Sequence, residues 1–323
     1  MFDAGKGEAT ERTLVAVFES KDLSAKAVYE KPAEANGEGN LTFYYDDEAH
    51  TGDNVVVFDV NPNTSVYDLP EWYEVSDIPP WVESDDRPIP YFNSEIDNGA
   101  NRPSKIVVTF DKTFSQYKQL TSLSCWFMPA IDRSDSNKLY SPFQFDSTSF
   151  KQLEYINTAS VYNLWYMFGG HENANEYAGS HITAIDLSGF DQANNLKNID
   201  GMFANCCDLT NLILPKDFGK NCSSMSHTFF NCRALTGEYL NTALSNLNTN
   251  SVRDMSYMFA SYKDSTGKTP IAQTTTLKFP KSFNTSNVET FEGMFAGYTN
   301  TQKLIITDDT PGKVGEPHKG CAN

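Results

Sequence analysis

The sequence is short of aliphatic and basic residues. Hydrophobic residues make up 39% of its 323 positions, and 25 Lys and Arg residues face 42 Asp and Glu residues, for a net charge of −17. A surface this negative repels phosphate backbones and anionic lipid, which argues against a nucleic-acid or membrane-surface binder. The 13% aromatic content excludes disorder of the whole chain. The low apolar share suits a thin core in a β-rich or repeat protein.

Long apolar runs are also missing. No stretch approaches the roughly 18 apolar residues of a membrane span, so we expect no membrane insertion of this segment. The first residues, Met1 to Lys6, lack the basic and then apolar run of a signal peptide. The sequence therefore leaves three routes open: a cytosolic protein, a protein whose signal has been removed, or export by another route.

Signatures of catalysis and of cofactor binding are absent from the sequence. The six cysteines form no CxxC pair, the five histidines form no HExxH motif, and no glycine-rich loop follows a strand to cradle phosphate. We therefore expect a protein that is not an enzyme and that needs no cofactor and no metal. The cysteines fit best as reduced, buried residues, with a disulfide as the less favoured alternative.

Two acidic segments come closest to a metal site. The stretch 59–63 opens like a calcium loop, but Thr64 stands where the loop needs Gly and Pro70 where it needs Glu. The second segment contains four candidate ligands: Asp46, Asp47, Glu48 and His50. These side chains could hold a cation, but a solvated turn at the tip of a hairpin is the preferred interpretation.

A Phe-centred block recurs six times. Counting back from each anchor Phe, the residues at seven, four and zero positions are all apolar, and the intervening positions are mostly polar. Offsets of seven, four and zero lie on one face of a helix, so each block is predicted to be a helix of about two turns. The anchors are Phe127, Phe168, Phe203, Phe229, Phe259 and Phe295.

A second pattern follows each anchor. Apolar residues alternate as L-x-x-L-x-L, which predicts a short strand with one face inward. Examples are Leu209, Leu212 and Leu214, and Ile182, Ile185 and Leu187. Each unit is thus a strand, a turn, a short helix and a segment that returns to the next strand. Such units predict an α/β repeat solenoid that is leucine-rich-repeat-like, with a small β-rich N-terminal region. The unit at 235–247 departs from the pattern because Glu238 falls on an inward position.

The recurring string resembles the BspA-type leucine-rich repeat region of bacterial surface proteins. The resemblance rests on residues 283–288 (Phe-Asn-Thr-Ser-Asn-Val), 254–259 (Asp-Met-Ser-Tyr-Met-Phe) and 185–191 (Ile-Asp-Leu-Ser-Gly-Phe-Asp). Cys206 and Cys232 stand at the cysteine position of that family's repeat. The resemblance implies surface adhesion, or interaction with a host or partner, and no catalysis.

The N-terminal third does not repeat. Strands are expected at 13–18, 25–29, 41–45 and 55–59, with the last two forming a hairpin. Six prolines between 69 and 104 predict an extended connector that packs Trp72 and Trp81 over the first repeat. The expected organisation is a small β-rich unit (1–68), a Pro/Trp-rich connector and cap (69–104), a solenoid of about six units (105–307) and a loose tail (308–323).

These expectations lead to a binding protein at the cell surface or outside the cell, with a protein or glycan ligand. Insertions gather at one point of the unit, around 128–149, 169–181 and 260–273, which predicts one loop-bearing edge. The alternative is a structural subunit of a larger extracellular or virion assembly. Candidate contacts on the loops are Tyr140, Phe143, Tyr177 and Tyr262. Candidate outward strand positions are Asp186, Ile213, Lys278 and Ile305.

Overall fold

The computed structural model describes most of the repeating region and parts of the N-terminal third. The described residues are 22–34, 37–60, 72–75, 90–92, 96, 103–128, 145–146, 148–170, 181–235, 237–261, 276–280, 283–297 and 305–308. The expected strand at 13–18, Trp81 and most of the three insertions lie outside these residues.

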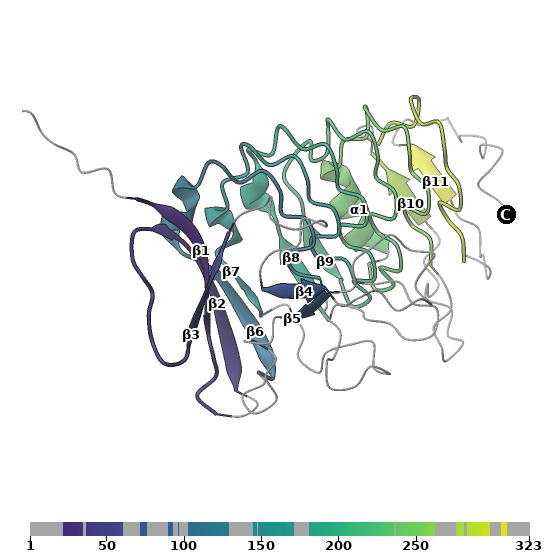
Figure 1. Ribbon diagram of the computed structural model, residues 1–323. Helices are drawn as coiled ribbons and strands as arrows, with labels where there is room; N and C mark the ends of the chain where they lie inside the picture. Colours follow the sequence, from purple (N-terminus) through teal and green to yellow (C-terminus); the bar gives the residue numbers. More distant parts are fainter. Residues whose placement is uncertain are drawn as a thin grey trace, which may run out of the picture.

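A mixed five-stranded sheet forms one end of the molecule (Figure 1). Its order is β3-β1-β2-β6-β7, in which β1 runs antiparallel to β2 and β3, whereas β2, β6 and β7 run parallel. The expected hairpin of β2 with β3 is wrong, because both strands flank β1. The bounds are β1 Ser24–Glu30, β2 Glu38–Asp46, β3 Val55–Asp59, β6 Lys105–Phe110 and β7 Phe150–Lys151.

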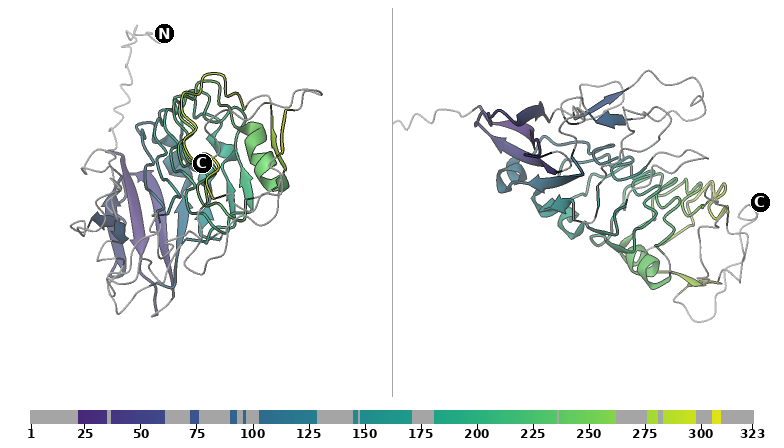
Figure 2. Two further views of the ribbon diagram at one scale, coloured as in Figure 1. Left: turned by 90° about the vertical axis from the view of Figure 1, so that its right-hand side faces the viewer. Right: turned by 90° about the horizontal axis from the view of Figure 1, so that it is seen from below.

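Shorter elements continue from this sheet toward the other end of the molecule (Figures 1 and 2). The parallel pairs β8–β9 and β10–β11 contain the alternating residues identified in the sequence, and their inward side chains Ile185 and Leu212 are buried. The bounds are β8 Ala184–Asp186, β9 Asn211–Ile213, β10 Thr276–Phe279 and β11 Ile305–Asp308; β4 Tyr73–Val75 pairs antiparallel with β5 Pro90–Phe92.

One α-helix, α1 (Gly237–Asn246), stands among the described residues. It lies between β9 and β10, contacts both, and occupies the unit whose strand pattern is broken (Figure 1). Leu240, Ala243 and Leu244 form its buried stripe, while Glu238 is exposed. A helix satisfies its own backbone groups, so it can fill this place where the alternation of a strand is missing.

The predicted α/β repeat solenoid is wrong. The described residues form a mainly β fold with a mixed five-stranded sheet, small two-stranded sheets and a single α-helix, and the repeated blocks are not helices. Each block consists of turns, because the residue two positions before each anchor has the left-handed conformation, which interrupts a right-handed helix. Those residues are Cys125, Tyr166, Gly201, His227, Tyr257 and Gly293.

We call these segments the turn blocks: 120–127, 161–168, 196–203, 222–229, 252–259 and 288–295. They lie one on the next through isolated parallel bridges that begin at Ser122↔Asn163 and end at Asp254↔Thr290. The inward positions expected from the sequence are buried in the first five blocks, and Val288, Phe291 and Phe295 are half-buried in the last. The anchor rings of neighbouring blocks pack together, as between Phe168 and Phe203 at 6.0 Å.

Candidate functional site

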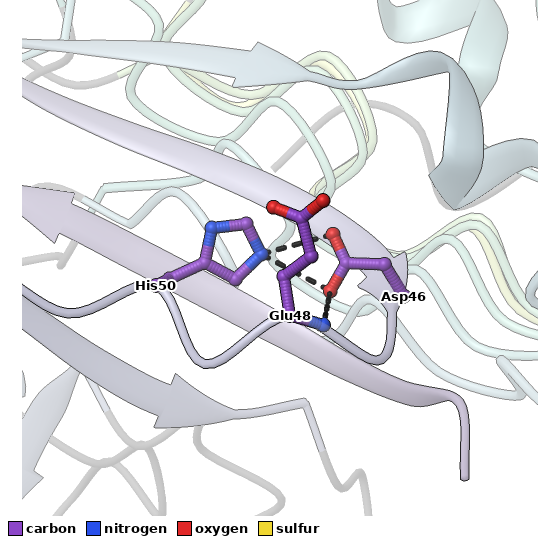
Figure 3. Close-up of side chains that lie close together, drawn as sticks. All are labelled: Asp46, Glu48 and His50. Carbon is purple, nitrogen blue, oxygen red and sulfur yellow. Dashed lines mark hydrogen bonds and ion pairs between the residues drawn. The ribbon is translucent and has the colours of Figure 1, made fainter. Parts of the chain in front are cut away.

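The densest group of potential metal ligands is formed by Asp46, Glu48 and His50, at the end of β2 and the start of the following loop (Figure 3). One ligand atom from each lies within 4.8 Å of the others. His50 Nε2 lies 2.9 Å from Asp46 Oδ2, and the His50 ring stacks on Tyr44 at 4.3 Å. The loop turns sharply here, since His50 has a φ of 44°.

This group already surrounds a cation. The Lys26 ammonium donates to Asp46 Oδ1 at 3.2 Å and to the carbonyl oxygens of Asp46 and Glu48 at 3.2 and 2.6 Å. Burial would raise the pKa of Asp46, but hydrogen bonds from His50 and Lys26 hold it below its usual value. A metal ion would have to displace an ammonium that three oxygens hold. Asp47 and Glu48 are exposed, as expected for a solvated turn, whereas the Asp46 side chain is only 15% exposed.

The strand candidates are placed on two sheets. Asp186 on β8 lies directly opposite Ile213 on β9, and both are exposed, Ile213 by 40%. Lys278 on β10 pairs with Thr307 on β11. Ile305 on β11 pairs with Thr276, which lies two residues before Lys278 on β10. Asp186 and Ile213 therefore lie opposite each other, whereas Lys278 and Ile305 lie on neighbouring strands two residues out of register. The helix α1 contacts both β9 and β10. The loop candidates Tyr140, Phe143, Tyr177 and Tyr262 lie outside the described residues.

Two exposed aromatic side chains were missed by the sequence reasoning. Tyr239 on α1 is 55% exposed, and Tyr162 at the edge of the second turn block is 47% exposed. Tyr239 follows Glu238, a charged residue at a position where the strand pattern requires an inward apolar residue. A helical period from Leu240 through Ala243 and Leu244 would have placed Tyr239 outward.

The cysteines form part of the packed interior. Cys206 Sγ donates to the Phe168 carbonyl at 3.4 Å, and Cys232 Sγ donates to the Phe203 carbonyl at 3.0 Å. Each thiol therefore bonds to the anchor of the preceding turn block. All five described cysteines are free thiols. Burial raises the pKa of Cys222 to about 12 and that of Cys232 well above its usual value.

A buried amide ladder runs beside these thiols. Asn205 Nδ2 donates to the Gly170 carbonyl at 3.1 Å, Asn231 Nδ2 to Asn205 Oδ1 at 2.8 Å, and Ser261 Oγ to Asn231 Oδ1 at 3.2 Å. All three side chains stand two residues after an anchor and are at most 2% exposed. Because each amide bonds to the block before it, a shift of one block against the next would leave buried polar groups unpaired.

A half-buried carboxylate links the third and fourth turn blocks. Asp200 Oδ1 accepts from Ser224 Oγ at 2.7 Å and from the Ser226 backbone N–H at 2.9 Å. Burial raises the pKa of Asp200 to about 6, and the nearby Asp254 charge adds to the rise, while these hydrogen bonds oppose it.

Ser226 and His227 stand next to this carboxylate but are not arranged for nucleophilic catalysis. His227 Nδ1 lies 2.8 Å from Ser226 Oγ, which donates its proton to the Ser256 carbonyl at 3.0 Å. The imidazole N–H therefore donates to the hydroxyl, the reverse of a base that activates a serine.

Comparison with known proteins identifies the family of the repeated region. No helix in the described part of the chain is long and apolar enough to cross a membrane. Neither the curated proteins nor the solved structures contain a significant match. A family model described as "Mycoplasma protein of unknown function, DUF285" matches residues 108–239 and again residues 219–312. These matches together span the turn blocks and more than half of the sequence, and the chain belongs to the DUF285 family.

Proposed function

We propose that this chain is a non-catalytic binding protein, displayed at the cell surface or outside the cell, that holds a protein or glycan ligand. One observation carries the proposal: β9 and α1, which contact each other, each carry a large apolar side chain in contact with water. Ile213 and Tyr239 are 40% and 55% exposed, and they lie on elements that contact each other. Exposed apolar groups beside polar ones are typical of interaction surfaces.

The chemistry of this surface suits recognition of a neutral or basic partner. Asp186 lies directly opposite Ile213, so an apolar and an acidic group stand side by side. The net charge of −17 disfavours a polyanionic ligand. The resemblance of the repeated strings to BspA-type surface proteins supports the same role, since adhesion is the function that the resemblance implies.

Binding to a glycan array and to immobilised host-cell glycoproteins tests the proposal. Ile213→Asp and Tyr239→Asp should each weaken binding of the positive probe about tenfold, because a charge would be placed where apolar surface is covered. Tyr162→Asp is the matched control, because Tyr162 is equally large, 47% exposed and located on a turn block. Equal binding by all three variants, with unchanged circular dichroism, would sink this surface as the site.

The loop candidates are tested separately. Shortening the insertions at 128–149 and 169–181 removes Tyr140, Phe143 and Tyr177 and keeps the strand face. Loss of binding in the shortened chains, together with unchanged binding by Ile213→Asp, would move the site from the strands to the loops. Absence of binding by the unmodified chain to every probe would refute the binding function for these ligand classes.

A further inference from the structure

The strand β3 lies at the outer edge of the five-stranded sheet (Figure 1). It pairs with β1 on one side, and no strand lies on its other side among the described residues. An outer strand presents backbone N–H and C=O groups in a row that a further strand can pair with. The occupant that such an edge selects is therefore another β-strand, and the residues of β3 decide its register.

The hydrogen bonds at the two ends of the β1–β3 pair show which backbone groups point outward. The Lys31 N–H donates to the Asn54 carbonyl at 2.8 Å. The Val60 N–H donates to the Ala25 carbonyl at 3.0 Å. Bonded and non-bonded pairs alternate along an antiparallel ladder, so the residues of β3 that bond to β1 are the even-numbered ones. The N–H and C=O of Val57 therefore point away from β1, where they meet no partner among the described residues.

The side chains along this edge are apolar and partly open to water. Val57 is 39% exposed, and Val55 and Val56 are half-buried. The strand contains neither lysine nor proline, the residues that commonly protect the outer strands of natural sheets. A strand that pairs with β3 would thus gain hydrogen bonds and cover apolar surface at the same time.

The sequence of β3, Val-Val-Val-Phe-Asp, is complementary to itself about Val57. In an antiparallel pair centred on Val57, that residue faces its own copy. Val56 then faces Phe58, and Val55 faces Asp59, so no two charges of the same sign are opposed. A pair centred on Asp59 would oppose two carboxylates, and a pair centred on Val55 would place Val57 opposite an aspartate. The edge is therefore matched to a second copy of itself in one register.

We propose that this chain forms a twofold dimer in which β3 pairs antiparallel with β3 of a second copy. The Val57 N–H of each copy donates to the Val57 carbonyl of the other, and the two five-stranded sheets join into one. A twofold contact closes on itself, because each copy offers the same surface to the other. The elements β9 and α1, which carry the proposed ligand surface, lie away from β3 (Figures 1 and 2). The dimer thus carries two such surfaces, which strengthens binding to a multivalent ligand.

The size and charge of the contact set its expected behaviour. A single pair of five-residue strands is a small interface, so the dimer should form reversibly and depend on protein concentration. Each copy carries a net charge of −17, so the two copies repel each other at long range. Added salt screens this repulsion and should strengthen the dimer, whereas salt would weaken a contact held by ion pairs.

Sedimentation equilibrium of the full chain, over a concentration series at low and high salt, tests the dimer. Val57→Lys should raise its dissociation constant at least about tenfold, because two ammonium groups would face each other across the axis. Val57→Pro removes the outward N–H and should weaken the dimer as well, while the bonds to β1 remain. Leu23→Lys is the matched control, because Leu23 is 41% exposed, receives the same charge and lies outside β3. Its dissociation constant should equal that of the unmodified chain.

Disulfide crosslinking tests the register. Residues in a hydrogen-bonded antiparallel pair have Cα atoms about 5.5 Å apart, which a disulfide can span. Val57→Cys should therefore give a covalent dimer under mild oxidation, as seen by electrophoresis without reductant. Val55→Cys should not, because the two copies of residue 55 would lie about 13 Å apart along the strands. The unmodified chain accounts for any crosslinking by the native cysteines.

Three results would overturn the proposal. The first is the mass of a single chain at every concentration, with no covalent dimer of Val57→Cys. The second is a dimer that keeps its dissociation constant in Val57→Lys and Val57→Pro, which would place the contact on another surface. The third is slow amide exchange of Val57 that does not depend on protein concentration, which would mean that the same chain covers this edge.

Discussion

The indole of Trp72 and the carbonyl of Trp126 are joined by a hydrogen bond of 3.1 Å that closes the first turn block. Trp72 is completely buried, and its ring packs edge-on against Trp126 at 5.1 Å and Phe43 at 5.2 Å. A residue from the proline-rich connector therefore supplies both the donor and the apolar cover that the first block needs. This contact is the one expected for Trp72, whereas Trp81, expected beside it, lies outside the described residues.

Removal of the indole donor should destabilise the protein. Trp72→Phe keeps an aromatic ring but leaves the buried Trp126 carbonyl without its donor, which should cost about 1–3 kcal/mol of unfolding free energy. Trp72→Ala also removes the packing and should cost about 3–5 kcal/mol. Urea denaturation measures both. A Phe variant as stable as the unmodified protein would show that the ring alone closes this end.

The amide ladder should depend on its middle member. Asn231→Ala removes the donor to Asn205 Oδ1 and the acceptor for Ser261, and should lower the unfolding free energy by about 2–3 kcal/mol. Asn195→Ala is the control, because Asn195 makes a comparable bond to the Ala159 carbonyl at 2.7 Å but is exposed. Its cost should stay below about 1 kcal/mol. Equal losses would show that burial of the ladder adds nothing.

Asp200 should make stability depend on pH. Its pKa is about 6 in the folded chain against an ordinary 3.8, so the folded state binds more protons between these values. The contribution of Asp200 to stability is therefore fully present below pH 3.8 and is lost as the pH rises through 6, by at most about 3 kcal/mol. Asp200→Asn should remove this fall and be the more stable protein at pH 7.

Thermal or urea melts at pH 4.5, 5.5 and 7 measure this difference. Asp186→Asn, which removes an exposed carboxylate, controls for the change in net charge. The assignment to Asp200 would be wrong if the two Asn variants had stability curves of the same shape.

Thiol labelling should follow burial. Cys125, Cys206, Cys222 and Cys232 are buried, whereas Cys207 is partly exposed. With Ellman's reagent at pH 8, Cys207 should be modified first among these five, and the other four only after unfolding, because a buried thiol remains protonated and inaccessible. Peptide mapping by mass spectrometry identifies the modified residue. Labelling of Cys232 at the rate of Cys207 would contradict the burial of Cys232.

The sequence contained the positions of the core but not the conformation of the backbone. Residues seven and four before each anchor were expected to share a buried face, and Val161, Leu164 and Phe168 do so. That spacing was interpreted as helical. A turn block produces the same spacing. The left-handed conformation of Tyr166 interrupts the helix, and alternate N–H groups of the block donate to carbonyl oxygens of the next block. Burial patterns alone do not distinguish these two sources of periodicity.

Nor did the sequence show which distant segments meet. β3 was expected beside β2 and instead pairs with β1, since register and neighbours depend on contacts that a local pattern does not encode. The proximity of Lys26 to Asp46 and Glu48 follows from the pairing of β1 with β2, which places Lys26 opposite Tyr44. All eight candidate contact residues stay predictions, and the four on the insertions lie outside the described residues.

The sequence by itself determined the number of blocks, the identity of their buried residues and the short inward strands, because apolar periodicity is a local property. Only the tertiary structure decided that the blocks are turns, that α1 replaces a strand, and that Trp72 closes the first block. Those outcomes depend on hydrogen bonds between residues 26 to 54 positions apart, as from Asn231 to Asn205 and from Trp72 to Trp126. Hydrogen bonds between residues so far apart in the sequence form only in the folded chain, so no local sequence pattern reveals them.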